Sequence, residues 1–152
     1  MSRTATDIIR ELRMEPIPQE GAWFSLGPRT QQLSSITVLL AGTRDGFSAL
    51  HRLSIDEGWQ WLDGAPAVML RLRRNGQGAV TMLGPEHRQQ LVRRGDWQGA
   101  ATLGDWTLAA CWCSPAFRDE HFELGSRKKL TAAYPTYAAE IAELTRPRKD
   151  RP

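Results

Sequence analysis

Apolar positions along the chain fall into short runs, and these runs predict β-strands more readily than helices. The most apolar run is Ile-Thr-Val-Leu-Leu-Ala at residues 36–41, which is made of strand-type residues and ends at a glycine. An Asn-Gly pair at residues 75–76 is a strong signal for a hairpin turn, because both residues tolerate positive φ. Further strands are predicted at 49–53, 57–62, 67–73, 79–83, 91–92, 98–101 and 106–113. Many short strands separated by Gly, Pro and Asn indicate a sandwich or barrel.

Helical patterns are confined to the two ends of the chain. Near the start, Thr6 or Asp7 can cap a short helix that continues through Met14 and ends at the Glu-Pro-Ile-Pro sequence of residues 15–18. Near the end, residues 134–144 carry an apolar stripe at helical spacing, with a proline suited to the first turn. The pattern as a whole therefore predicts an all-β domain with short terminal helices.

Length and charge point to one domain without a nucleic-acid partner. A chain of 152 residues is expected to form a single domain, which we place at residues 1–146, followed by a basic, disordered tail at 147–152. The formal net charge of +3 comes largely from basic residues at the end of the chain: Arg146, Arg148, Lys149 and Arg151. Terminal basic residues are typical of a solvated tail, so we expect no nucleic-acid binding.

Neither a membrane span nor a signal peptide is predicted. No stretch approaches the roughly 18 consecutive apolar residues of a membrane helix, and the N-terminus lacks an apolar signal core. We therefore expect a cytoplasmic protein without a membrane partner. The two cysteines, Cys111 and Cys113, flank Trp112 and should share one face of a strand, too close in sequence for an ordinary disulfide. They are expected to be reduced, buried small hydrophobes, with Trp106 and Trp112 packed in the core.

Residues 46–64 hold the most informative motif in the chain. His51 is followed six residues later by Glu57, and Gly64 comes seven residues after that. The spacing resembles the first cupin motif, which reads G, then H-x-H-x(3,4)-E-x(6)-G. Leu53 stands where that motif has its second His.

The resemblance extends along nearly the whole chain and is to the Cupin_5 (DUF985) family of the RmlC-like cupin superfamily. Matching segments lie in order at residues 8–16, 20–24, 51–59, 83–85, 95–98, 103–106, 114–124 and 134–135. The resemblance implies a cupin jelly-roll β-barrel, also called a double-stranded β-helix, with short N- and C-terminal helices. It also implies a homodimer. The chain departs from the family pattern at Ala22, Trp23, Gln60 and Arg93.

Metal binding would require a ligand set that this chain has largely lost. Cupins commonly use three His and one Glu, and the resemblance places Gln98 where the second motif has a metal-binding His. His51, Glu57 and Gln98 remain, and a neutral amide is a weak ligand for Zn, Fe or Mn. We expect no cofactor, and keep a divalent metal on these three residues as an alternative.

Acid–base chemistry is the favoured function, with His51 and Glu57 as the catalytic residues. A His and a carboxylate in an aromatic pocket shift each other's pKa, and proton transfer beside a carbonyl needs no metal. RmlC-like sugar epimerases are similar, so the prediction is a small-molecule isomerase, epimerase or lyase in which Arg52 and Gln98 hold a carbonyl or anionic group. The alternative is a binding protein without catalysis. In a purely structural interpretation, His51 and Glu57 only form hydrogen bonds with each other or with neighbouring side chains, so that no buried polar atom is left without a partner.

Four tryptophans are candidates for the walls of the ligand pocket, where they would stack on a planar or sugar-like ring. They are Trp23, Trp59, Trp61 and Trp97. Core packing is the alternative for each of them. By strand parity Trp59 and Trp61 share a face with Glu57, whereas Gln60 should face away from it. The other two histidines, His87 and His121, lie in polar segments and are expected to be solvated.

Overall fold

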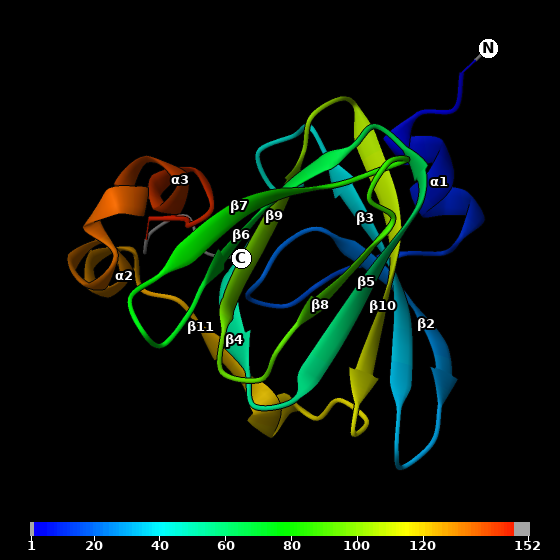
Figure 1. The fold of residues 1–152 in the computed structure, drawn as a ribbon. Helices are drawn as coiled ribbons and strands as arrows, with labels where there is room; N and C mark the ends of the chain where they lie inside the picture. The colour runs from blue at the N-terminus through cyan, green and yellow to red at the C-terminus, as the bar shows by residue number, and fades with distance from the viewer. Residues whose placement is uncertain (1, 148–152) are drawn as a thin grey trace.

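The structure, a computed structural model, describes residues 2–147, and its strands form two antiparallel sheets that close into a jelly-roll barrel (Figure 1). The first sheet has the strand order β1-β2-β3-β10-β5-β8, and the second has the order β11-β4-β9-β6-β7. The strands are β1 (Glu15–Pro16), β2 (Trp23–Arg29), β3 (Ser34–Ala41), β4 (Ser48–Leu53), β5 (Asp56–Gly64), β6 (Ala67–Leu72), β7 (Gly78–Leu83), β8 (Gln89–Val92), β9 (Trp97–Thr102), β10 (Trp106–Ser114) and β11 (Phe122–Leu124).

Short helices lie at the two ends of the chain. They are α1 (Ala5–Glu11), η1 (Asp119–His121), α2 (Arg127–Ala133), η2 (Pro135–Tyr137) and α3 (Ala138–Glu143). None of the helices in the described part of the chain is long and apolar enough to cross a membrane.

Three apolar layers hold the molecule together. Between the sheets, buried side chains of both sheets form the main core, with Trp59 and Met69 among the largest. Outside the first sheet, Ile8 of α1 packs on Leu39. Outside the second sheet, the C-terminal helices pack on the strands through residues such as Ile141. In Figure 1, α1 and the α2–α3 pair accordingly lie on opposite sides of the barrel.

The predicted strands are confirmed, and several boundaries and elements are corrected. The 75–76 turn joins β6 to β7, with Gly76 at φ +80°. Helix α1 is capped by Thr4, not Thr6 or Asp7, and it ends at Glu11 before Met14. The predicted helix at 134–144 is divided into η2 and α3. The sequence pattern missed β1, β2, β11 and α2.

The prediction that Trp112 packs in the core is wrong, and Arg146 is more buried than a terminal basic residue was expected to be. Trp112 is 42% exposed on the outer face of β10, whereas Trp106 is half-buried beside α1. Arg146, which lies inside the predicted domain at 1–146, is buried, so its charge is not part of a solvated tail. Residues 148–152 of the predicted tail lie outside the described residues.

Candidate functional site

His51 lies in the middle of the barrel, on the inner face of β4, and is only 2% exposed. Its Nδ1 lies 2.7 Å from the carbonyl oxygen of Ala49, and its Nε2 lies 3.2 Å from Oε1 of Glu20. A carbonyl can only accept a hydrogen bond, so Nδ1 must carry a proton. The Nε2–Oε1 contact therefore needs one more proton, held by either Glu20 or His51.

A strained loop before β2 positions Glu20. Two residues of this loop adopt left-handed backbone conformations although neither is glycine, with φ of 66° at Gln19 and 65° at Ala22. The Glu20 carbonyl accepts hydrogen bonds from the Ala49 N–H at 3.0 Å and from Nη1 of Arg146 at 2.7 Å. Non-glycine residues in this region cost free energy, and such strain gathers at functional sites. The loop thus holds a buried carboxyl group against the His51 ring.

Glu57 and Gln98 complete the interior cluster, which we define as Glu20, His51, Glu57 and Gln98. The side chain of Glu57 on β5 is in contact with Cys113 on β10, where Oε2 and Sγ are 3.3 Å apart. Gln98 on β9 accepts a hydrogen bond from the indole N–H of Trp59 at 2.8 Å. Because Gln98 pairs in register with His51, its side chain enters the barrel beside the imidazole.

Burial dominates the electrostatics of the interior cluster. Burial raises the pKa of Glu20 to about 8, although the Arg146 guanidinium opposes the shift. Burial also raises the pKa of Glu57, and there the main opposing effect is attraction to His51. The pKa of His51 is lowered by burial, against the attraction of Glu57. Near neutral pH these directions favour a protonated Glu20 and a neutral His51 that accepts its proton.

The structure brings four of the predicted site residues together inside the barrel: His51, Glu57, Trp59 and Gln98. Trp61 packs at the margin of the same core, and the guanidinium of Arg88 lies 5.2 Å from its ring centroid. His51 and Glu57 do not satisfy each other by a hydrogen bond, because their partners are Ala49, Glu20 and Cys113.

Three predicted ligand-binding residues lie outside the barrel. Arg52 and Trp97 are on the outer face of the second sheet, where the guanidinium carbon of Arg52 lies 4.6 Å from the Trp97 ring centroid. Arg52 also forms an ion pair with Glu123. Trp23 packs with Leu39 beneath α1, outside the first sheet. Gln60 faces outward, as strand parity predicted.

A surface pocket of about 390 Å³ lies near the interior cluster. Arg52, His121 and Phe122 are among the residues that line it. The Phe122 ring also stacks on the His51 ring, with centroids 5.3 Å apart. His121 is half-buried against Phe117 while it lines the surface pocket, so it is only partly solvated, whereas His87 is exposed as expected.

The donors in the barrel do not fit a resident divalent metal. Both ring nitrogens of His51 already face protein oxygen atoms, and Gln98 is engaged by an indole. Among residues 2–147, no three His, Cys, Asp or Glu side chains are grouped so that they could hold a metal ion.

Sequence reasoning missed Glu20, Cys113 and Phe122 as members or neighbours of this site. A signal for Glu20 was present, because the segment at residues 20–24 matches a recurrent family sequence that begins with Glu-Gly. For Cys113, strand parity placed the thiol on the inner face but named no partner. Phe122 lies on a strand of only three residues, too short for a periodic signal.

Two antiparallel sheets that close around an inward-facing His and carboxyl groups define a protein of the cupin class. More specifically, the chain belongs to the family described as Cupin superfamily (DUF985), whose sequence pattern matches residues 6–125. No match was found among curated proteins.

Solved structures agree with this assignment. A protein from Shewanella oneidensis is 30% identical, with a TM-score of 0.88 over 97% of this chain and 100% of that one. A hypothetical protein from Leishmania major is 21% identical, with a TM-score of 0.86 over 95% of this chain and 100% of that one. Oxalate decarboxylase from Bacillus subtilis is similar in fold alone, at 12% identity and a TM-score of 0.61 over 86% of this chain and 37% of that one.

Proposed function

We propose that the protein is a small-molecule enzyme of the isomerase, epimerase or lyase type, in which His51 transfers a proton without a metal. The observation that carries the proposal is the 3.2 Å contact between Nε2 of His51 and Oε1 of Glu20, deep in the barrel. A His whose Nδ1–H is fixed on a carbonyl keeps its lone pair on Nε2. In the resting site that lone pair accepts the Glu20 proton, so the substrate has to replace Glu20 as its partner before Nε2 acts as the general base.

In the proposed reaction, Nε2 of His51 removes a proton from a substrate carbon next to a carbonyl group. The electron pair of the broken C–H bond moves into the carbonyl, and the ring becomes an imidazolium. Glu57 attracts that cation, as its effect on the His51 pKa already indicates. Returning the proton to the same or a neighbouring carbon gives an epimer or isomer, while loss of a leaving group gives a lyase product.

The substrate is proposed to enter from the pocket beside Phe122. Phe122 contacts both this pocket and the His51 ring, so rotation of its side chain would connect the two. Arg52 lines the pocket and offers a guanidinium to an anionic or carbonyl group outside the barrel. Trp59 and Gln98 are proposed to contact the substrate inside the barrel, with Trp61 at its margin.

Proton exchange with solvent tests the proposal before the substrate is known. Small aldehydes, ketones and keto sugars are incubated with the protein in D2O, and loss of the C–H signal next to the carbonyl is followed by proton NMR. We expect exchange with the wild type, and a loss of about 10²-fold or more in His51→Gln and Glu20→Gln. His87→Gln is the matched control, because this His is exposed in the loop between β7 and β8 and is not a member of the interior cluster.

The same samples separate the alternatives. A compound that binds the wild type without exchange, and binds His51→Gln less well, would identify a binding protein and overturn catalysis. Metal-dependent chemistry, the remaining alternative, requires stoichiometric Fe, Zn, Mn or Ni in the purified protein. Elemental analysis that finds such a metal in the wild type and not in His51→Gln would overturn the metal-free proposal.

We further propose that the protein acts as a homodimer in the cytoplasm. Strands β7 and β8 are edge strands of their sheets, along which a second copy could pair. Cys111 and Cys113 are free and buried, which is consistent with a reducing compartment.

A further inference from the structure

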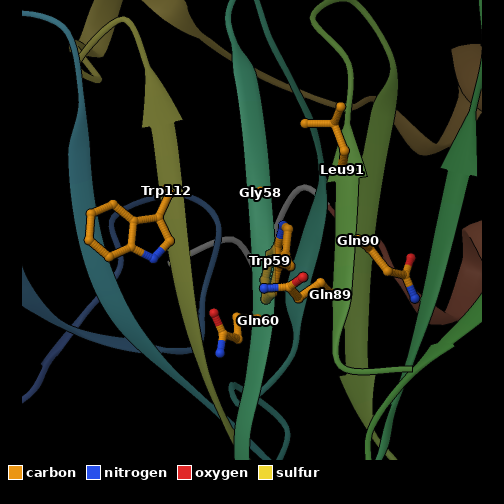
Figure 2. A pocket seen from close by; sticks show the side chains of 7 residues that line it. All are labelled: Gly58, Trp59, Gln60, Gln89, Gln90, Leu91 and Trp112. Atoms are coloured by element: carbon orange, nitrogen blue, oxygen red, sulfur yellow. The ribbon is translucent and has the colours of Figure 1, made fainter. Parts of the chain in front are cut away.

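The outer face of the first sheet carries a groove that plays no part in the proposed reaction. Figure 2 shows that its side chains come from three neighbouring strands, β10, β5 and β8. Trp112 pairs in register with Gly58, which pairs in turn with Leu91. The next outward-facing row contains Gln60 and Gln89.

Gly58 is what makes this row hollow. A Cβ placed on Gly58 would meet no atom within 4 Å, so the space above the strand is open. The Trp112 indole and the Leu91 side chain therefore form the two sides of a groove, and the backbone at Gly58 forms its floor. The resulting outer groove, which we define by Gly58, Gln60, Gln89, Leu91 and Trp112, has a volume of about 240 Å³.

The outer groove suits a ligand that is a neutral ring with polar groups along its edge. Trp112 and Leu91 are 42% and 53% exposed, which leaves an indole and an alkyl surface facing solvent. The backbones of Gln60 and Gln89 are paired in the sheet, but their side-chain amides make no hydrogen bond to another residue in the described part of the chain, so these amides are available to a ligand. By contrast, Gln90 is already engaged, because it bonds to Thr81 and to the Met82 carbonyl.

The lack of charged residues around the outer groove narrows the class of ligand further. None of the residues that line the outer groove is charged, so a phosphate or carboxylate would find no cation there. A pyranose ring has apolar C–H faces that stack on an indole and a rim of hydroxyl groups that amides recognise. We propose that the outer groove binds a neutral pyranose sugar, independently of the proposed chemistry in the barrel.

Gly58→Val is the decisive variant, because its side chain occupies the outer groove and its Cβ would meet no atom within 4 Å. Saturation-transfer NMR is recorded with methyl β-D-glucopyranoside and methyl β-D-galactopyranoside as probes. We expect transfer to at least one probe with the wild type, and binding about tenfold weaker or worse with Gly58→Val and Trp112→Ala. Leu26→Ala, which removes another exposed apolar side chain on the first sheet, should bind like the wild type.

Folding and assembly are measured on the same variants. Gly58→Val should unfold at the same temperature as the wild type or higher, because a β-branched residue suits a strand better than glycine. The proposal is overturned if neither probe receives saturation from the wild type, or if Gly58→Val binds as well as the wild type. It is also overturned if Gly58→Val halves the mass measured by light scattering, because a second copy would then be the occupant.

Discussion

The proton between His51 and Glu20 links the stability of the barrel to pH. The folded state raises the pKa of Glu20 from its ordinary value of 4.5 to about 8, so between these values the folded protein holds a proton that the unfolded chain has lost. Stability from this residue is present below pH 4.5 and is lost as the pH rises through 8. The lowered pKa of His51 acts in the other direction, below its ordinary value of 6.5.

Between pH 6.5 and 8, Glu20 is therefore expected to dominate. The free energy of unfolding of the wild type should fall over this range, by at most about 1.4 kcal/mol for each pH unit. Glu20→Gln keeps the shape but cannot ionise, so its curve should be less steep than that of the wild type. Glu57, whose pKa burial also raises, accounts for any slope that is left. Urea unfolding at a series of pH values provides the measurement, with Glu86→Gln as the exposed control. A Glu20→Gln curve as steep as the wild-type curve would contradict the assignment.

At the scale of single residues, the motif spacing and the family resemblance named three of the four residues of the interior cluster: His51, Glu57 and Gln98. Alternation along β5 placed Glu57 and Trp59 on one face, and the structure agrees. Glu20 could not be found in this way, because it lies in a loop where no periodicity says which way a side chain points. Its distance of 31 residues from His51 is closed only by the folded barrel.

The loop around Glu20 depends on the last described turn of the chain. Arg146 donates to the carbonyl oxygens of Glu20 and Phe47, and its guanidinium carbon lies 3.7 Å from the Phe47 ring centroid. A Cβ on Gly21 would lie 2.3 Å from Nη2 of Arg146, so glycine is needed there for close packing as well as for its φ of +87°. The C-terminal segment thus holds the candidate site from outside the barrel.

Arg146→Ala should destabilise the protein by about 2–3 kcal/mol, because it removes charge-assisted hydrogen bonds to buried carbonyl groups. The midpoint of urea unfolding measures the loss. Lys128→Ala is the control, since this exposed side chain on α2 should change stability by less than about 0.5 kcal/mol. Equal stabilities of the Arg146 and Lys128 variants would show that Arg146 does not fix the loop.

Elements with strong local signals were predicted from the sequence, and those stabilised by their neighbours were not. The Asn-Gly turn was predictable because both residues tolerate positive φ, and β3 was predictable from its run of apolar, strand-type residues. Strand β2 contains Gly27 and Pro28, which locally disfavour a strand, and it exists because it pairs with β3. The predicted C-terminal helix is divided, because Pro135–Tyr137 form a 3₁₀ turn and the α-helix starts only at Ala138.

The layered arrangement of the whole molecule leaves sheet edges open at β7 and β8. Burial of an edge by a second copy removes unpaired backbone groups from solvent, so we expect a homodimer. Light scattering during size-exclusion chromatography should give twice the 17.1 kDa mass of the chain. A mass of one chain at micromolar concentration would contradict this expectation.

The fold class of the whole molecule could be predicted, because the many short strands separated by turn residues and the family resemblance both indicate a β-barrel. The side of a sheet on which a residue lies was harder to assign. Trp97 matches a motif near Gln98 but faces the opposite way, since neighbours in a strand alternate between faces. Trp112 was expected in the core because it lies between two cysteines that are indeed buried.

The residue found at position 58 in related proteins would also show whether the outer groove is used. Folding gains nothing from a glycine at a mid-strand position with open space above it, and a larger residue would suit the strand better. Random substitution should therefore replace this glycine in any lineage in which the groove is unused. Lineages that use the groove should keep the glycine together with the indole opposite it. Joint conservation of Gly58 and Trp112 would therefore indicate that the outer groove is used, separately from the selection that maintains the barrel.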